Sequence, residues 1–385
     1  MAKKQLSVSY ICDSFYPVVG GVAEVSNQIA FRFKKRGYDV RVYAPDWDHE
    51  QRIKRKEEIV QKVPVTRVHH WFRIGNFGVV WPQIFFILLK SDTDIIHAHV
   101  AGHLHTFLAA LASRIKRKKF FVTTHSPWGE EGKRSFVGKT ARSISYNFFL
   151  PFVFKSAEKI YILTEYEEFF VKKYGGKSKQ IVIIPNGIDD QYFKFDVSNV
   201  RKEYGFNEYD KLILFVGRLD ENKNPVEFVK IGKLLTKNYP KQKYKFLIAG
   251  PDRGERQSII REIGYHTNFR LLGTVKSQKL VELYHSCDLL LMTSLREAFG
   301  LVAIEAFSQG LPVVAPKTGG LPYVIRDDQN GYLYKPGDIE DGAEKVHAII
   351  SNNILKNEMS IRNRKAAKRY KWEKLIDKIE EGYLA

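Results

Sequence analysis

Short apolar runs alternate with amphipathic stretches along nearly the whole chain. The apolar runs have the length of buried strands, and the amphipathic stretches have the period of helices. This alternation predicts an α/β fold with parallel sheets, because parallel strands need a crossover helix between them. We expect strands near residues 6–12, 38–44, 64–70, 94–98, 120–124, 159–163, 181–184, 212–216, 244–249, 269–272, 288–292 and 312–315. Helices fit between them, for example over residues 21–36 and 102–116.

The chain of 385 residues is too long for one ordinary core and predicts two domains. The alternating pattern occurs in both halves, which predicts two Rossmann-like, doubly wound domains. The turn Pro185-Asn186-Gly187 follows the last strand of the first half and marks the boundary. We therefore expect an N-terminal domain over residues 1–188 and a C-terminal domain from residue 189 onwards.

Composition excludes several classes of protein. Apolar residues make up 44% of the chain, as in a soluble globular protein. No apolar run reaches about 18 uncharged residues, so no transmembrane helix is expected. Residues 1–12 lack the apolar core and cleavage site of a signal peptide, so we expect a cytoplasmic protein. Cys12 and Cys287 match no metal spacing and are expected to be buried free thiols.

The formal net charge of +19 points to an anionic partner. Nucleic acid, anionic lipid and a phosphorylated substrate all have the required charge. The basic excess is heavier in the first half of the chain. It peaks between Arg114 and Arg142, where nine basic residues are opposed only by Glu130 and Glu131.

Two glutamates, Glu297 and Glu305, flank a predicted loop-to-helix junction at Gly300. Eight residues of helix advance about 12 Å, so the two carboxylates cannot share one metal ion or one proton. They can hold the two ends of a long ligand whose middle lies at the helix start, where free N–H groups favour phosphate. A nucleotide sugar has this form. Two solvated helix glutamates are the alternative, but Gly319 and Gly320, which permit close backbone approach, favour a ligand site.

Two further loops follow predicted strands. Gly20 and Gly21 put bare backbone N–H groups at a helix start, where a phosphate could dock, although a tight turn would also need small residues there. Arg218 and Lys223 follow the strand near residues 212–216, at the end where open α/β sheets bind ligands. The two cations could neutralise a leaving diphosphate, or they could be ordinary solvated charges.

Five histidines lie at the ends of two predicted strands of the first half. His125 ends the strand near residues 120–124. The other four lie around the end of the strand near residues 94–98 and are His97, His99, His103 and His105. No cysteine pattern or HExxH helix completes a zinc site, so we expect polar side chains that line a site and no bound metal.

Together these residues resemble retaining glycosyltransferases of the GT-B type, in the large family (glycosyltransferase family 4) that includes glycogen, sucrose and lipid-linked mannosyl transferases. The resemblance covers nearly the whole chain. It implies a GT-B fold, in which two Rossmann-like domains face one another across a cleft. The domains would be an acceptor-binding domain over residues 1–188 and a donor-binding domain over residues 189–368. A C-terminal helix over residues 369–385 would return to the first domain. The motifs that carry the resemblance are Gly20-Gly21-Val22, His125, Pro185–Asp189, Gly217–Lys223 and Glu297–Glu305.

The resemblance also implies the role of each motif residue. Arg218 and Lys223 would hold the diphosphate of a UDP- or GDP-sugar. Glu297 would bind hydroxyls of the transferred hexose, with His125 near the reacting sugar, and Glu305 would bind the ribose. Members of the family use no catalytic metal, so neither metal nor cofactor is expected. The remaining implied donor-binding residues are Gly20, Gly21, Thr274, Val275, Phe299, Gly300 and Leu301.

The acceptor is predicted from the basic first domain. Family members with lipid acceptors are similar in having a basic, aromatic-rich first domain, which predicts peripheral contact with the cytoplasmic face of a membrane. Alternatively, the aromatic residues pack in a core and the lysines form a solvated face. The predicted membrane or acceptor contacts are Arg114, Lys116, Arg117, Lys118, Lys119, Trp128, Lys133 and Arg134.

Three other interpretations stay open at this point. One is a soluble glycosyltransferase that acts on a sugar or polysaccharide. Another is a basic α/β protein that binds nucleic acid, although the chain lacks an aromatic-basic RNA-binding motif and no nucleic acid is expected. The last is an enzyme of the same fold that isomerises or cleaves its donor without an acceptor.

Overall fold

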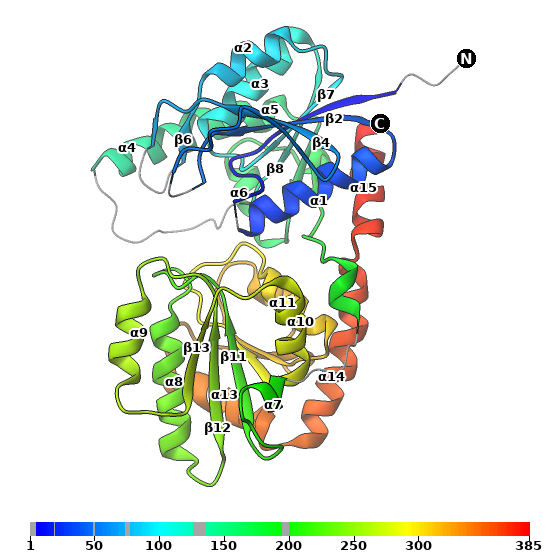
Figure 1. Ribbon diagram of the computed structural model, residues 1–385. Coiled ribbons are helices and arrows are strands. Elements are labelled where there is room, and N and C mark those ends of the chain that lie inside the picture. The colour runs from blue at the N-terminus through cyan, green and yellow to red at the C-terminus, as the bar shows by residue number, and fades with distance from the viewer. Residues whose placement is uncertain (1–4, 19, 49–50, 74–77, 126–135, 195–199) are drawn as a thin grey trace. The chain divides into compact units, whose positions relative to one another are not determined.

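The computed structural model describes residues 5–18, 20–48, 51–73, 78–125, 136–194 and 200–385. The chain forms two compact units (Figure 1). Unit 1 contains residues 1–186 together with residues 373–385, and unit 2 contains residues 187–372. Within the described residues, no helix combines the length and the apolar character that crossing a bilayer requires.

Unit 1 is built on an eight-stranded sheet with the strand order β10-β9-β8-β7-β1-β2-β4-β3. All neighbouring strands are parallel except β3, which is antiparallel to β4 at the edge. The strands of this sheet are β1 (Ser7–Ile11), β2 (Asp39–Pro45), β3 (Glu57–Val60), β4 (Val63–Val68), β7 (Ile95–His99), β8 (Lys119–Thr123), β9 (Lys159–Ile162) and β10 (Ile181–Ile183). A separate antiparallel pair joins β5 (Phe72–Arg73) to β6 (Val79–Val80).

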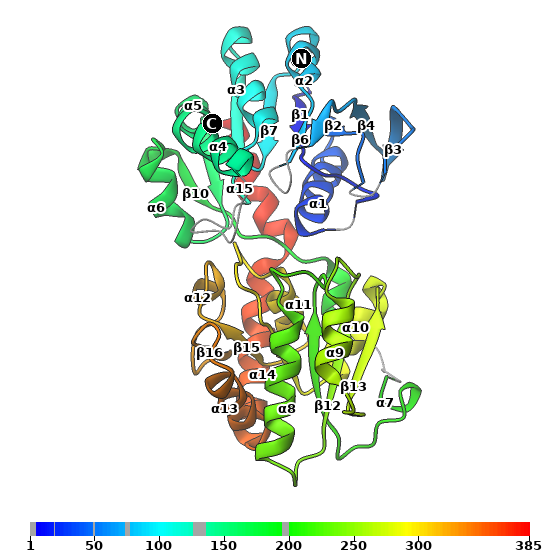
Figure 2. The ribbon, with the colours of Figure 1, turned by 90° about the vertical axis from the view of Figure 1, so that its left-hand side faces the viewer.

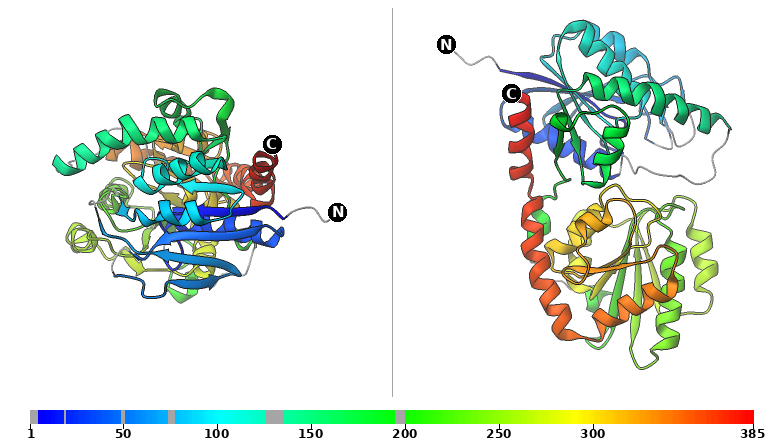
Figure 3. Two further views of the ribbon diagram at one scale, coloured as in Figure 1. Left: turned by 90° about the horizontal axis from the view of Figure 1, so that it is seen from above. Right: turned by 180° about the vertical axis from the view of Figure 1, so that it is seen from behind.

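Helices cover both faces of this sheet (Figures 2 and 3). Side chains from α2, α3, α5 and α6 form one apolar core with the sheet, whereas α1 and α15 pack against the other face. The central strand β7 is buried along its whole length, as expected for a parallel strand covered on both faces. The helices are α1 (Gly21–Lys35), α2 (Gln83–Lys90), α3 (Leu104–Lys116), α4 (Phe136–Ile144), η2 (Ser145–Phe149), α5 (Leu150–Ser156), α6 (Tyr166–Lys173), η3 (Ser178–Gln180) and α15 (Trp372–Leu384).

The C-terminal helix α15 is an integral part of unit 1. Tyr383 is 1% exposed, and its hydroxyl hydrogen-bonds to the Tyr10 hydroxyl at 3.1 Å. Its ring lies 4.9 Å from that of Phe33 in α1, and α15 runs beside α1 in Figure 1. On the same helix, the Ile379 carbonyl accepts a hydrogen bond from the Tyr161 hydroxyl at 3.3 Å. These contacts confirm that the terminal helix packs with the first domain.

Unit 2 is built on a six-stranded parallel sheet with the order β13-β12-β11-β14-β15-β16. Its strands are β11 (Lys211–Val216), β12 (Tyr244–Ala249), β13 (Phe269–Gly273), β14 (Leu289–Leu291), β15 (Val313–Pro316) and β16 (Gly331–Tyr334). Its helices are η4 (Asp190–Phe193), α7 (Val200–Glu203), α8 (Pro225–Asn238), α9 (Arg256–Ile263), α10 (Ser277–Ser286), α11 (Leu301–Ser308), α12 (Leu321–Val324), α13 (Ile339–Ile350), α14 (Asn353–Ala367) and η5 (Lys368–Tyr370). Side chains from α8, α9 and α13 form one core with this sheet.

The predicted α/β architecture with parallel sheets is confirmed, and each expected strand lies within two residues of an observed one. Sequence reasoning missed the edge strands β3 and β16 and the two-residue strands β5 and β6. β3 is a charged segment that pairs with only one neighbouring strand, and β16 begins at a glycine. Such short strands depend on tertiary pairing more than on their own composition.

The packing of α15 on unit 1 predicts how substitutions in this helix change the free energy of unfolding. Tyr383→Ala should lower the free energy of unfolding by about 3–5 kcal/mol, because a large buried ring leaves a cavity when it is removed. Leu384→Ala at the neighbouring position, which is 61% exposed, should change it by less than about 0.5 kcal/mol. Urea unfolding followed by circular dichroism measures both. Equal losses from the two variants would mean that α15 does not pack on unit 1 as described.

Candidate functional site

The strand order of unit 2 reverses next to its central strand. From β11 the chain adds β12 and β13 on one side and then crosses over to β14 on the other. In open α/β sheets, ligands bind at such a reversal, outside the carboxyl ends of the strands. The loops that follow β11 and β14 therefore define the candidate site of unit 2. They contain Arg218 and Lys223 in the first loop and Glu297 in the second.

The two loops are joined by an ion pair between Lys223 and Glu297. The Lys223 ammonium donates to Oε1 of Glu297, and both side chains are largely buried. The Ser294 hydroxyl donates to the same oxygen at 3.1 Å. Two residues that are 74 positions apart in sequence thus meet as opposite charges at the strand-order reversal. A charge in such a partly buried place interacts more strongly with a ligand than one in free solvent.

Asp220 holds the two cations of the first loop in place. Its Oδ2 accepts from Arg218 Nε at 2.9 Å, and its Oδ1 accepts from the Lys223 backbone N–H at 2.9 Å. The Arg218 side chain is 48% exposed. Among the described residues, Asp220 is its only ion-pair partner, so the terminal N–H groups of the guanidinium can reach an incoming anion.

Backbone and side-chain hydrogen bonds fix the loops to one another. The Leu295 N–H donates to the Asn222 carbonyl at 2.8 Å, and the Thr293 hydroxyl donates to the Lys223 carbonyl at 3.0 Å. The loop after β15 joins them, because the Gly320 N–H donates to the Glu297 carbonyl at 2.8 Å. The three loops are therefore pre-organised before any ligand binds.

The close approach of the loop after β15 to the Glu297 main chain requires a glycine at position 319. Gly319 has φ +52°, and a Cβ there would lie 2.0 Å from the Glu297 carbonyl oxygen. A larger residue would therefore push the Glu297 loop away. The contact between the two loops therefore explains why residue 319 is a glycine, whereas the sequence suggested only that it allows a ligand to approach the backbone.

Helix α11 begins beside the ion pair. Gly300 has φ 94°, in the left-handed region, and no side chain caps the helix start at Leu301. The Phe299 ring is buried against Tyr370, with ring centroids 5.8 Å apart, so only the main chain of Phe299 can face a ligand. The helix starts after β14, at the same sheet edge as the loop with the cations, and main-chain N–H groups at a helix start favour an anion.

Glu305 lies inside α11 and is nearly buried. It accepts a hydrogen bond from the Tyr284 hydroxyl at 2.8 Å. Burial and the neighbouring carboxylate raise the Tyr284 pKa well above its usual value, so the phenol stays a donor. Because the helix starts only at Leu301, the interval from Glu297 to Glu305 is not two full helical turns. The estimate of about 12 Å assumed eight residues of helix, and only the residues from Leu301 onwards are helical.

Thr274 and Val275 follow β13 at the same sheet edge. Their strand is separated from β11 by β12, so these residues lie at the flank of the candidate site. Among the described residues, neither Thr274 nor Val275 forms a hydrogen bond with Lys223 or Glu297.

Unit 1 also has a strand-order reversal, between β1 and β7. Gly20 and Gly21 follow β1 at the start of α1. A Cβ added at either glycine would meet no described residue within 4 Å, and neither has a positive φ in the left-handed region. Packing against the described residues therefore does not require glycine at these two positions, and close approach of another molecule is a physical reason for them.

His125 follows β8 at the same edge of unit 1. Its φ of 49° is unusual for a residue with a side chain. Its Nε2 is 2.8 Å from Nδ1 of His99, and the two rings stack with centroids 5.1 Å apart. His97 also stacks with His99, with ring centroids 4.8 Å apart, and is hydrogen-bonded to the hydroxyls of Tyr383 and Thr123. The histidines of β7 and His125 thus form one buried stack.

Burial keeps these imidazoles neutral. It lowers the pKa of His125 to about 4, and burial with the neighbouring His125 lowers the pKa of His97 to about 3. The pKa of His99 lies well below its usual value for the same reason, with its histidine neighbours adding to the effect. At neutral pH, His125 can donate or accept a hydrogen bond but carries no charge.

One group of residues in unit 1 has donor types that suit a metal. Asp13, His103 and His105 have ligand atoms within 4.8 Å of one another, and His103 Nδ1 is 3.1 Å from Asp13 Oδ1. These are residue types that bind zinc in proteins. The separations do not decide whether a metal binds there, so the expected absence of a metal stays a prediction.

Two Asp-x-Asp triplets occur in unit 1, at residues 46–48 and 92–94. Asp46 accepts from the His70 backbone N–H at 2.9 Å and from Arg52 at 3.1 Å. Asp94 accepts from the Ser7 hydroxyl at 2.9 Å. These carboxylates are engaged in linking segments of the domain.

The basic residues predicted to meet a membrane or acceptor do not lie beside His125. They stand at the end of α3 and the start of β8, at the amino edge of the sheet, whereas His125 follows the carboxyl end of β8. The residues at that amino edge are Arg114, Lys116, Arg117, Lys118 and Lys119. The other predicted contacts, Trp128, Lys133 and Arg134, lie outside the described residues.

Several residues of the candidate sites were not found from the sequence. Asp220 and Ser294 support the ion pair, Tyr284 binds Glu305, and His99 contacts His125. Asp220 and Ser294 each bind a group three residues further along the chain, and an aspartate that accepts from the N–H three residues on is the pattern of an N-cap. The contacts of Tyr284 and His99 join separate elements and depend on how the chain folds.

Comparison with known proteins agrees with this geometry. A family model described as "Glycosyl transferases group 1" matches residues 196–366, and one described as "Glycosyltransferase Family 4" matches residues 19–192. The N-acetyl-alpha-D-glucosaminyl L-malate synthase of Bacillus anthracis is 24% identical over 98% of this chain and 97% of its own.

Two solved structures show the same fold. HepE of Anabaena, solved in complex with UDP and glucose, has a TM-score of 0.78 at 21% identity and covers 98% of this chain and 99% of its own. Sucrose-phosphate synthase of Thermosynechococcus elongatus has a TM-score of 0.76 at 18% identity and covers 98% of each chain. The predicted fold of two Rossmann-like domains is therefore confirmed.

The buried histidines predict how stability depends on pH. Their folded-state pKa values lie below the unfolded value of about 6.5, so the unfolded chain binds more protons as the pH falls. Stability is therefore complete above about pH 6.5 and decreases below it, by up to about 1.4 kcal/mol per pH unit for each such histidine. His125→Asn should reduce this slope by about one histidine's share. Denaturant titrations over this pH range measure the slope.

The matched control is His266→Asn, because His266 is an exposed residue of unit 2. It should leave the slope unchanged. If His125→Asn also leaves the slope unchanged, His125 is not buried as a neutral imidazole.

Proposed function

Because the chain belongs to the GT-B glycosyltransferases of the family 4 type, we propose that it transfers a hexosyl unit from a nucleoside-diphosphate sugar to an acceptor hydroxyl with retention of configuration. The observation that carries this proposal is the Lys223–Glu297 pair, with Arg218 close by, at the strand-order reversal of unit 2. It provides positive charge for a diphosphate and a carboxylate for sugar hydroxyls in adjacent loops.

The ion pair gives the donor a way to assemble its own site. Without ligand, Lys223 and Glu297 neutralise each other. A diphosphate carries more negative charge than one carboxylate and competes for the Lys223 ammonium. Glu297 is then free to accept hydrogen bonds from the hydroxyls of the hexose, with Ser294 still holding one of its oxygens. Arg218 adds a second cation from the exposed side.

The other donor-binding roles follow the family resemblance. The main-chain N–H groups around Phe299, Gly300 and Leu301 would bind phosphate oxygens, and Glu305 would accept from the ribose hydroxyls. Thr274 and Val275 would lie against the base. In unit 1, we propose that the bare backbone at Gly20 and Gly21 binds phosphate, and that His125, as a neutral imidazole, hydrogen-bonds to a sugar hydroxyl.

Charge development explains how these groups would accelerate transfer. Cleavage of the sugar–phosphate bond leaves a nucleoside diphosphate with additional negative charge and a cationic sugar. Fixed cations and helix N–H groups stabilise the diphosphate without reorganising, and in many enzymes such stabilisation supplies most of the rate enhancement. With Arg218 and Lys223 in that role, we propose that the reaction needs no metal. The leaving phosphate would help to deprotonate the acceptor, so no carboxylate nucleophile is required.

UDP is the nucleotide that we propose first. HepE of Anabaena was solved with UDP, and the Bacillus anthracis relative is named for transfer of an N-acetylglucosaminyl group. GDP is the alternative. Transfer in the presence of EDTA, with the anomeric configuration of the product read by NMR, tests metal independence and retention together.

Substitution of the ion pair tests the site. Lys223→Ala and Glu297→Ala should each lower kcat/KM for the donor by about 10²–10³, because each removes a pre-organised electrostatic contact to the transition state. The control is Lys233→Ala, which breaks an ion pair with Glu262 in the same unit, at 3.0 Å. It should keep near-normal turnover. If the two site variants fold and also turn over normally, the site is assigned wrongly.

For the acceptor, we propose a membrane lipid or a lipid-linked glycan. The supporting observation is a set of exposed apolar side chains on helices of unit 1 that cover one face of its sheet. Phe86 in α2 is 63% exposed, Ile115 in α3 is 58% exposed and Phe148 in η2 is 68% exposed. Arg114 and Arg142 lie on the same helical layer and carry the charge that anionic lipid attracts. A soluble sugar or polysaccharide acceptor is the alternative.

Vesicle sedimentation separates these two acceptor classes. Wild-type protein should bind vesicles of phosphatidylglycerol, and Phe86→Ser with Phe148→Ser should weaken binding by about tenfold or more, because each exposed ring would otherwise be buried in lipid. Tyr265→Ser removes an exposed ring of unit 2 and should bind as the wild type does. Wild-type protein that stays in the supernatant would favour the soluble acceptor.

A further inference from the structure

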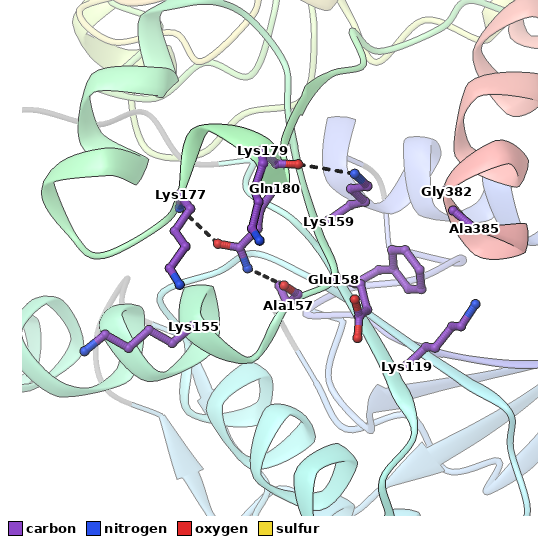
Figure 4. A pocket seen from close by; sticks show the side chains of 11 residues that line it. Lys119, Lys155, Ala157, Glu158, Lys159, Lys177, Lys179, Gln180, Gly382 and Ala385 are labelled. Carbon is purple, nitrogen blue, oxygen red and sulfur yellow. Dashed lines mark hydrogen bonds between the residues drawn. The ribbon is translucent and has the colours of Figure 1, made fainter.

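Unit 1 contains a pocket of about 440 Å³ at the amino edge of its sheet (Figure 4). This volume lies within the range of roughly 300–1,000 Å³ that is common for ligand pockets. The walls come from the starts of β8 and β9, the end of α5, the segment before β10 and the end of α15. Five lysines line the pocket, namely Lys119, Lys155, Lys159, Lys177 and Lys179.

The charge of this pocket is only weakly compensated. Glu158 is the one acidic side chain that lines it. None of the five lysines forms an ion pair with a carboxylate in the described part of the chain. Lys119 and Lys159 already donate to main-chain carbonyls, those of Tyr383 at 3.3 Å and Lys179 at 3.2 Å. The ammonium groups of the other three lysines make no hydrogen bond to the described residues, so they are available to a ligand.

The lysines are held by a structured segment. Gln180 donates to the Phe154 carbonyl at 3.0 Å and also to the Ala157 carbonyl, so it fastens the segment before β10 to the end of α5. Its Oε1 accepts from the Lys177 N–H at 3.0 Å. Figure 4 shows the bonds from Lys177 to Gln180 and from Gln180 to Ala157, which hold the segment of Lys177 and Lys179 without help from a ligand.

The pocket is separate from the candidate site of unit 1. Lys119 begins β8, whereas His125 follows the carboxyl end of the same strand. Five residues of strand span roughly 16 Å, so the length of β8 separates the pocket from His125. An anion in the pocket therefore cannot be the donor phosphate that Gly20 and Gly21 are proposed to bind.

We propose that this pocket is a second anion site, which binds a ligand with several phosphate charges. Several ammonium groups around one concave surface favour a multiply charged ligand over a single carboxylate, since each lysine then has its own oxygen partner. A free polyphosphate and the head group of an anionic phospholipid share this chemistry. This inference does not depend on the proposed glycosyl transfer, because it concerns other residues at the opposite edge of the sheet.

The test compares two triple variants that lose the same charge. Lys155→Gln, Lys177→Gln and Lys179→Gln remove the three available lysines of the pocket. Lys202→Gln, Lys237→Gln and Lys241→Gln remove three exposed lysines of unit 2 as the control. Binding of inorganic tripolyphosphate is measured by calorimetry with UDP in excess, and binding of mixed phosphatidylglycerol and phosphatidylcholine vesicles by sedimentation.

The pocket variant should lose about a hundredfold in affinity for at least one probe, while the control keeps wild-type affinity. Loss of tripolyphosphate binding alone identifies a free anion as the ligand, and loss of vesicle binding alone identifies a lipid head group. Gln180→Ala keeps every charge but frees the segment, so it should weaken the same probe by a smaller factor. If the pocket variant binds both probes as the control does, the proposal is overturned.

Discussion

The ion pair between Lys223 and Glu297 depends on the strand order of unit 2, and the proposed function depends on the ion pair. Because β11 and β14 are neighbours although β12 and β13 intervene in the chain, two loops 74 residues apart meet at one sheet edge. Ser294 donates a hydrogen bond to the carboxylate, and Asp220 accepts hydrogen bonds from Arg218 and from the Lys223 N–H, so these groups are fixed before the ligand arrives. Such pre-organisation lets charges stabilise a transition state without the cost of reorganising them.

Unit 1 uses its sheet in a different way. Its carboxyl edge holds neutral, stacked histidines and, after β1, two glycines that packing against the described residues does not require, whereas its amino edge holds lysines with few acidic partners. The neutral histidines and the lysine pocket thus lie at opposite edges of one sheet. The net charge of +19 is therefore not distributed evenly over the surface. Part of it lies at the amino edge of the sheet of unit 1, where the parallel strands β8 and β9 begin.

The sequence was sufficient for the fold because buried parallel strands are nearly continuous apolar runs, such as the segment around Leu212–Val216. It also indicated that the motif residues follow strand ends, where ligand sites of α/β sheets lie, and the structure has them there. It could not reveal that Glu297 pairs with Lys223, since strand neighbours are set by topology. It likewise could not reveal the lysine pocket, because residues 119, 155 and 177 come together only through the register of β8 to β10.

The most direct test of the central claim is a crystal structure of the protein with UDP. We expect the β-phosphate to lie within hydrogen-bond distance of Lys223 Nζ and the Arg218 guanidinium. We also expect Glu297 to have parted from Lys223, and Glu305 to accept from the ribose hydroxyls. UDP bound away from the carboxyl ends of β11 and β14, or bound there with the Lys223–Glu297 pair intact, would contradict the proposed role of the ion pair.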